Sequence, residues 1–316
     1  MEKKKVLVIG LGPGGGILAA YLSNSNNSVY GIDPWIEHVA EIKENGLSIV
    51  HFASIHTYLE KVYNSFDELD EKGFDYVVIA VKTPNLPEVI DGLRNLPGYF
   101  DIIVAQNGID NEEYVARFFP RERIFRMALH YAGNMISPGT IRMNFFQKPN
   151  RIGCICTGNG CSHSEEFAAI LTHAGLDTTS EADIRKYTWK KGILNAILAP
   201  VSATLGVTMA EVMDFEPTRQ IVDSLIRECI EVAKAVGYDY GENFFDECVG
   251  FLKNAGHHKP SMLIDLEKGN PTEIDYISAK IVESAKLFNI PAPVNATITG
   301  LVKAREKYNS VKRRET

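Results

Sequence analysis

The sequence is poor in cysteine and has no long apolar run. Its 316 residues include five cysteines, which form no obvious disulfide framework, and a chain of this length does not need one. No stretch approaches the roughly 20 apolar residues that span a bilayer. A basic start precedes the apolar run Val6–Ile9, but this run is too short for a signal peptide and glycines follow it at once. These absences favour a cytoplasmic protein with no membrane partner.

The chain also lacks an excess of positive charge. Its formal net charge is -7, so nothing suggests a nucleic-acid partner. The basic residues Lys312, Arg313 and Arg314 stand at the chain end, where charges are usually solvated. Hydrophobic residues make up 45% and charged residues 23%, the balance of a globular protein. A chain this long is too large for one ordinary core, so two domains are expected.

A glycine-rich turn follows the first predicted strand. Val6–Ile9 is a fully apolar run, typical of a parallel strand buried on both faces. Gly10, Gly12 and Gly15 have the spacing that permits a tight turn, close approach to a pyrophosphate and close helix packing. The helix predicted next would offer free N–H groups to phosphates. The sequence therefore predicts a dinucleotide site that includes Gly10, Gly12, Pro13, Gly14 and Gly15.

Asp33 ends the second predicted strand, 29–32. An acid at this place can accept hydrogen bonds from the ribose hydroxyls of NAD and would repel the 2′-phosphate of NADP. No arginine occurs among residues 34–37, so NADH is favoured over NADPH, which is not excluded. The alternative is that Asp33 only caps the loop.

Two further strand ends carry polar residues. Strands predicted at 76–81 and 102–105 lead into Lys82 and Asn107. Ligands bind outside the carboxyl ends of parallel strands, so both side chains are expected near the cofactor. Asn107 precedes Gly108, a common turn pair, and a plain turn is an equal alternative.

Two domains are predicted, 1–180 and 181–316. Further strands are expected at 123–130, 139–144 and 151–156, with a closing helix at 164–174. From 181 the apolar spacing becomes helical, with helices at 182–205 and 217–236 and a last helix at 277–288. Lys191 and Asn195 are four residues apart and share a helix face. We find no internal repeat.

Four metal-ligand types cluster around residue 160, but we expect no metal. Cys154, Cys156, Cys161 and His163 do not have the spacing of a zinc knuckle or ribbon.

Several motifs together resemble the ketopantoate reductase (2-dehydropantoate 2-reductase) family. They run almost end to end, and the Lys-to-Asn helix and the Ser-Met-Leu to Glu-Ile-Asp-Tyr spacing are the most specific. The motifs are the glycine turn, 81–83, 106–108, 189–191 with Asn195, 260–263 and 272–276. The resemblance implies a Rossmann domain followed by an all-α domain of the 6-phosphogluconate dehydrogenase-like type.

The resemblance also implies a reaction, reduction of ketopantoate to pantoate in coenzyme A biosynthesis, usually with NADPH. Lys191 would be the general acid that protonates the carbonyl oxygen. Asn195 would hold the substrate and Ser261 would bind its carboxylate. Glu273 would lie near the ribose and the active-site network, and Asn107 near the nicotinamide. Positive charge and a proton at a developing oxyanion are what hydride addition to a ketone requires.

Two substrate positions depart from the family pattern. Ala199 and His258 stand where asparagines are usual, which leaves a different 2-oxo acid open as the substrate. His258 could bind a carboxylate or hydroxyl, or be a surface residue. Two other functions remain: an opine-type or other 2-hydroxy acid dehydrogenase, and a non-catalytic dinucleotide sensor. An apolar face on the C-terminal helices could belong to the core or to a homodimer, and the sequence leaves both open.

Overall fold

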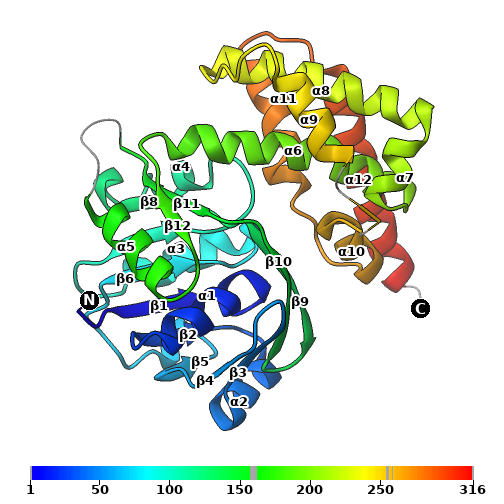
Figure 1. Cartoon of the computed structure of the whole chain (residues 1–316). Helices are drawn as coiled ribbons and strands as arrows, with labels where there is room; N and C mark the ends of the chain where they lie inside the picture. Colours follow the sequence, from blue (N-terminus) through cyan, green and yellow to red (C-terminus); the bar gives the residue numbers. More distant parts are fainter. Residues whose placement is uncertain (1, 157–161, 254–255, 258, 315–316) are drawn as a thin grey trace. The chain divides into compact units, whose positions relative to one another are not determined.

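The computed structural model describes residues 2–156, 162–253, 256–257 and 259–314 (Figure 1). Cys161 and His258 lie outside the described residues. The chain forms two compact units, which we describe separately. The first runs to Gln106 and resumes over Asp110–Thr188, and the second comprises Asn107–Ile109 and the chain from Trp189 onward.

An eight-stranded sheet forms the centre of the first unit. Its strand order is β12-β11-β8-β7-β6-β1-β2-β5. The bounds are β1 Lys5–Ile9, β2 Ser28–Ile32, β5 Lys61–Tyr63, β6 Tyr76–Ile79, β7 Asp101–Val104, β8 Ile124–Ala128, β11 Asn150–Cys154 and β12 Thr178–Ser180.

The six strands β5, β2, β1, β6, β7 and β8 are parallel neighbours. This is the strand order of a doubly wound dinucleotide-binding sheet. Successive strands are added on one side of β1 first and then on its other side, so the strand order reverses at β1. Val6–Ile9 of β1 is buried along its whole length, as expected for a strand covered on both faces. The predicted Rossmann domain is confirmed.

Helices cover both faces of this sheet. One core combines β1 with α1, α5 and the second sheet described below, and another packs against α3 and α4. The bounds are α1 Pro13–Asn24, α2 Ile36–Asn45, α3 Leu86–Arg94, α4 Asn111–Val115 and α5 Ser162–His173, with 3-10 turns η1 Phe66–Glu68, η2 Thr83–Asn85 and η3 Arg121–Arg123.

A second sheet of four strands lies against α1 (Figure 1). Its order is β4-β3-β10-β9, with bounds β3 Leu47–His51, β4 Ile55–Thr57, β9 Tyr131–Ser137 and β10 Thr140–Phe146. The sequence indicated only the β10 region. The others were missed because their outer faces are exposed and their apolar pattern is weak, as in β9, where exposed Ile136 follows half-buried Met135.

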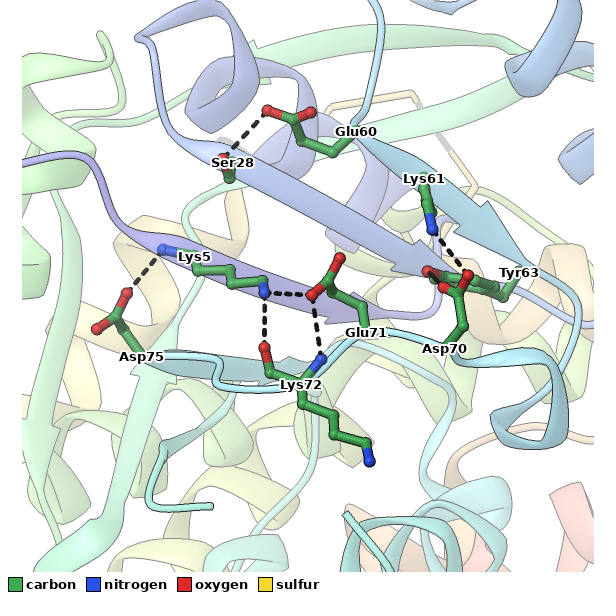
Figure 2. A network of polar contacts seen from close by, with 9 residues as sticks. All are labelled: Lys5, Ser28, Glu60, Lys61, Tyr63, Asp70, Glu71, Lys72 and Asp75. Atoms are coloured by element: carbon green, nitrogen blue, oxygen red, sulfur yellow. Dashed lines mark hydrogen bonds and ion pairs between the residues drawn. The ribbon is translucent and has the colours of Figure 1, made fainter. Parts of the chain in front are cut away.

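A polar network fastens the end of β1 that lies away from the glycine turn (Figure 2). The Lys5 ammonium donates to the Glu71 carboxylate and to the Lys72 carbonyl, both at 2.6 Å. Asp70 accepts from the Tyr63 hydroxyl at 2.6 Å and from Lys61 at 2.8 Å. These bonds hold the segment before β6 against the sheet.

Within its described residues, the second unit contains helices and no strand. A helix is present where 277–288 was predicted, but the prediction that it is the last helix was wrong, because α12 follows it. The bounds are α6 Ile184–Leu205, α7 Met209–Asp214, α8 Glu216–Val236, α9 Phe244–Lys253, α10 Ser261–Lys268, η4 Ile274–Tyr276, α11 Ser278–Leu287 and α12 Pro293–Arg314. The division between the units falls after Thr188, inside α6. A search of the described helices finds none with the length and apolarity to cross a membrane.

Candidate active site

The glycine turn joins β1 to α1 through positions where a side chain cannot fit. Gly10 has φ +91°, and a Cβ there would lie 2.8 Å from the Val81 nitrogen. A Cβ on Gly15 would lie 2.0 Å from the Gly10 carbonyl oxygen. Both glycines are therefore required by packing within the turn.

Gly12 differs, because a Cβ there would meet nothing within 4 Å. It is the N-cap of α1, and Pro13 follows at the first helical position, where its missing N–H is not needed. The N–H groups of the first turn, including those of Gly14 and Gly15, have no acceptor within the helix. Open space, free N–H groups and the positive end of the helix dipole together suit a pyrophosphate.

Asp33 lies beside this turn and is half-buried. One carboxylate oxygen accepts from the Leu11 N–H at 2.8 Å, and the other accepts from the Trp35 N–H at 3.0 Å. Asp33 therefore does cap the loop, which the sequence left open as the alternative to cofactor binding. Each oxygen has a second lone pair, so capping leaves room for a hydroxyl donor.

Two residues that the sequence did not suggest also support the turn. Gly139 donates its N–H to Nδ1 of buried His38 at 2.9 Å, and Nε2 of His38 lies 3.1 Å from the Leu11 carbonyl. Because Nδ1 accepts, the network assigns the ring proton to Nε2. Tyr131 donates to the Gly14 carbonyl at 2.7 Å. His38 is 27 residues from Leu11, and the other two pairs are 101 and 117 residues apart, so no local pattern marks them.

Lys82 is exposed and is the N-cap of η2 after β6. A buried polar cluster lies in the same region, where Asn111 donates to Thr83 at 3.2 Å and Glu112 pairs with Arg126 at 3.1 Å. Burial raises the pKa of the Glu112 carboxyl, and the Arg126 charge opposes that rise. No pattern in the sequence indicated this ion pair.

Lys190 and Lys191 are consecutive residues of α6, and the contacts of Lys190 lie in the second unit. Its ammonium donates to Glu247 at 2.8 Å and lies 5.2 Å from the centre of the Phe244 ring. Lys191 is half-buried, and Asn195 lies one turn further along α6.

Asn107 and Glu273 belong to the same unit as Lys191. Asn107 is exposed, and two residues later the Ile109 N–H donates to the Tyr276 carbonyl at 2.9 Å. Glu273 is half-buried and its carbonyl accepts from the Tyr276 N–H at 3.0 Å. The loop of Asn107 is thus bonded to the turn that begins at Glu273.

The predicted substrate residues that the structure describes lie on two helices, Asn195 on α6 and Ser261 on α10. Ser261 is the exposed first residue of α10, and Ala199 is half-buried on α6 directly before Pro200. His258 lies outside the described residues, so its role stays a prediction.

The cysteine cluster has other partners. The sulfurs of Cys154 and Cys156 lie 2.8 Å apart, and Nδ1 of His163 lies 2.7 Å from Asp101. Among the residues that the model describes, no three ligand side chains are placed to hold a metal ion.

The doubly wound sheet, the glycine turn and the acid after β2 define a dinucleotide-binding protein of the Rossmann class. The sequence model "Ketopantoate reductase PanE/ApbA" matches residues 6–156, and "Ketopantoate reductase PanE/ApbA C terminal" matches 183–306. The chain belongs to the ketopantoate reductase family and is an NAD(P)-dependent oxidoreductase.

Similarity to curated relatives and solved structures spans nearly the whole chain. The 2-dehydropantoate 2-reductase of Aquifex aeolicus is 27% identical, over 96% of this chain and 98% of the relative. That of Pyrococcus abyssi is 27% identical, over 98% and 100%. A ketopantoate reductase structure from Ralstonia eutropha has TM-score 0.88 at 22% identity, over 97% and 99%. D-mandelate dehydrogenase with NADH has TM-score 0.86 at 25% identity, over 96% and 99%.

Proposed function

We propose that this protein reduces a 2-oxo acid to a 2-hydroxy acid with a nicotinamide dinucleotide, and that ketopantoate is its first candidate substrate. The observation that carries the proposal is the full-length similarity to relatives named 2-dehydropantoate 2-reductase. The second unit retains the residue types that the reaction needs, including Lys191 and Asn195 on α6.

Lys191 is the general acid in this proposal. When bound, the reduced nicotinamide supplies a hydride to the carbonyl carbon. The ammonium of Lys191 gives a proton to the carbonyl oxygen as negative charge develops there, and a water later reprotonates the amine. The choice of Lys191 rests on the motif 189–191 with Asn195, which resembles that of the family.

Ser261 and Asn195 bind the substrate. Ser261 opens α10, so the substrate carboxylate would meet a hydroxyl donor and the positive end of a helix dipole. Asn195 shares a face of α6 with Lys191 and offers an amide to a substrate oxygen.

The first unit binds the cofactor, in the proposal, through the glycine turn, Lys82 and Asp33. The Asp33 carboxylate is fixed by two backbone N–H groups, so it is ready to accept from a ribose hydroxyl without further ordering. Its charge opposes a 2′-phosphate. We propose a preference for NADH over NADPH on this ground.

A different 2-oxo acid is the second candidate substrate. Ala199 offers no hydrogen bond where the family usually has asparagine, which widens the site and makes it less polar. The similarity to a D-mandelate dehydrogenase favours a 2-oxo acid with a larger apolar group.

The test is to monitor the oxidation of NADH and NADPH by absorbance. Ketopantoate is the first substrate, and 2-oxo acids of increasing apolar size are tried next. We expect turnover that is faster with NADH. Lys191→Ala should lower kcat by roughly 10²- to 10⁴-fold, since proton transfer and charge stabilisation are both lost.

Lys190→Ala is the matched control, because it removes the adjacent ammonium and should keep kcat within about threefold. Equal activity of the two alanine variants would remove Lys191 from the mechanism. Binding of NADH without turnover of any oxo acid would favour a dinucleotide sensor.

A further inference from the structure

We infer that Ile109 is a positioning residue, which fits against Gly192 and thereby sets the Asn107 loop and the Glu273 turn relative to Lys191. The expected effect on catalysis rests on the proposed function, whereas the contact between Ile109 and Gly192 does not. The pair is held by contacts within the second unit.

Ile109 is carried into the second unit by a three-residue excursion of the chain. Asn107–Ile109 group with this unit, although Gln106 and Asp110 on either side belong to the first. Gly108 has φ +107° and Asp110 has φ +59°. Two left-handed residues therefore bracket Ile109 and reverse the chain around it.

The Ile109 side chain is 1% exposed and belongs to the core of the helical unit. It occupies the space that a side chain at Gly192 would need. A Cβ on Gly192 would lie 2.5 Å from Cγ1 and 2.8 Å from Cδ1 of Ile109. Both distances are too short for carbon atoms, so the glycine and the isoleucine are complementary in size.

The same residue is bonded to the turn that carries Glu273. The Ile109 N–H donates to the Tyr276 carbonyl at 2.9 Å. Thr272, directly before this turn, also fixes it. The Thr272 N–H donates to the Glu306 carboxylate of α12 at 2.6 Å, and the Thr272 hydroxyl accepts from the Ile274 N–H at 3.2 Å.

Ile109 thus links three segments that are far apart in the sequence. It follows Asn107 by two residues, contacts the residue after Lys191, and bonds to the turn that begins at Glu273. The bond to the Glu273 turn is made by the Ile109 backbone and the contact with α6 by its buried side chain, so a shift at Ile109 is expected to displace all three segments. Proton transfer depends on such placement, since an error of about 1 Å can cost about 10²-fold in rate.

The geometry is tested first without reference to activity. A Cβ on Gly192 would lie 3.9 Å from the Cβ of Ile109, within the range of a disulfide. We expect the variant Ile109→Cys/Gly192→Cys to form that disulfide under a glutathione redox buffer, seen as a linked peptide by mass spectrometry. Gly192→Cys alone is the control, run beside the wild type because of the native cysteines.

The positioning role is tested by kinetics. Gly192→Ala should lower kcat by about 10- to 100-fold, because the added Cβ displaces Ile109. Adding Ile109→Ala removes the clashing atoms and should recover kcat to within about threefold of wild type, which a general loss of packing would not allow. Gly300→Ala is the matched control, since a Cβ there meets nothing within 4 Å on α12.

The outcomes separate the inference from the proposed function. Absence of the linked peptide, or unchanged kcat in Gly192→Ala, overturns the inference. A fall in melting temperature that tracks the fall in kcat, with no recovery in the double variant, shows packing alone and also overturns it. If the wild type reduces no 2-oxo acid, the proposed function fails, and the disulfide still decides whether Ile109 docks on Gly192.

Discussion

Asp33 caps the loop, and we propose that the same carboxylate also binds the cofactor ribose. It fixes the glycine turn by accepting from Leu11, and it places a negative charge where the ribose of a dinucleotide is expected. An asparagine at this position would keep one acceptor for the turn while removing the charge, which makes it a selective probe.

Asp33→Asn should raise KM for NADH by roughly 10- to 100-fold, the worth of a hydrogen bond to a charged group. The ratio of kcat/KM for NADPH to that for NADH should rise, since the repulsion of the 2′-phosphate is lost. Steady-state kinetics with both cofactors measures this ratio. Asp91→Asn, at an exposed position on α3, is the control, and a ratio that stays constant in Asp33→Asn contradicts the assignment.

Helix α5 is fastened to the sheet by a carboxylate with two donors. Glu166 accepts from the Lys4 ammonium at 2.7 Å and from the buried Tyr76 hydroxyl at 2.6 Å. The Lys4 hydrogen bond, followed by that from Tyr76, lowers the pKa of Glu166 below its ordinary value. A carboxyl with a lowered folded pKa adds stability above its unfolded pKa, and this stability is lost as pH falls through the folded pKa.

Glu166→Gln should therefore destabilise the protein at pH 7 and have a smaller effect below the ordinary glutamate pKa of 4.5. The side chain is 43% exposed, so solvent screening limits the loss at pH 7 to about 1 kcal/mol. Denaturant unfolding of both proteins at a series of pH values measures it. A difference in unfolding free energy that grows on acidification would refute the assignment.

At the scale of the whole molecule, the apolar cores of the two units are separate. Each unit contains one of the two tryptophans. Trp35 is 41% exposed near the glycine turn and stacks on His38. Trp189 is 1% exposed in the core of the helical unit. Separate cores predict separate responses to a ligand that binds one unit.

In the variant Trp35→Phe, fluorescence follows Trp189 alone. NADH at a hundredfold excess over its Kd adds about 2.7 kcal/mol to the unit that binds it, which is roughly 5–10 °C for a unit of this size. We expect calorimetry to show a shift of this size in one transition and Trp189 to shift less. Equal shifts by both methods would mean that the molecule unfolds as one cooperative unit.

The sequence by itself determined the dinucleotide-binding architecture. Glycines, buried β-branched runs and an acid after a strand are local signals, because each is required by the backbone geometry at its own position. The helical period after 181 likewise predicted α6 and α8. The change to helical period at 181 also suggested a domain boundary near 180, and the family resemblance suggested the catalytic residues Lys191 and Glu273. Both remain predictions.

Only the tertiary structure decided which distant residues support the site. His38 and Tyr131 hold the glycine turn, Glu112 pairs with Arg126, and Ile109 fits against Gly192. Strands β3, β4 and β9 of the second sheet and helix α12 were missed for a similar reason, since strands with one exposed face and a polar terminal helix have weak patterns. Most of these contacts bring together segments from far along the chain, and none follows from a repeating pattern of residue types, so folding alone brings the partners into one place.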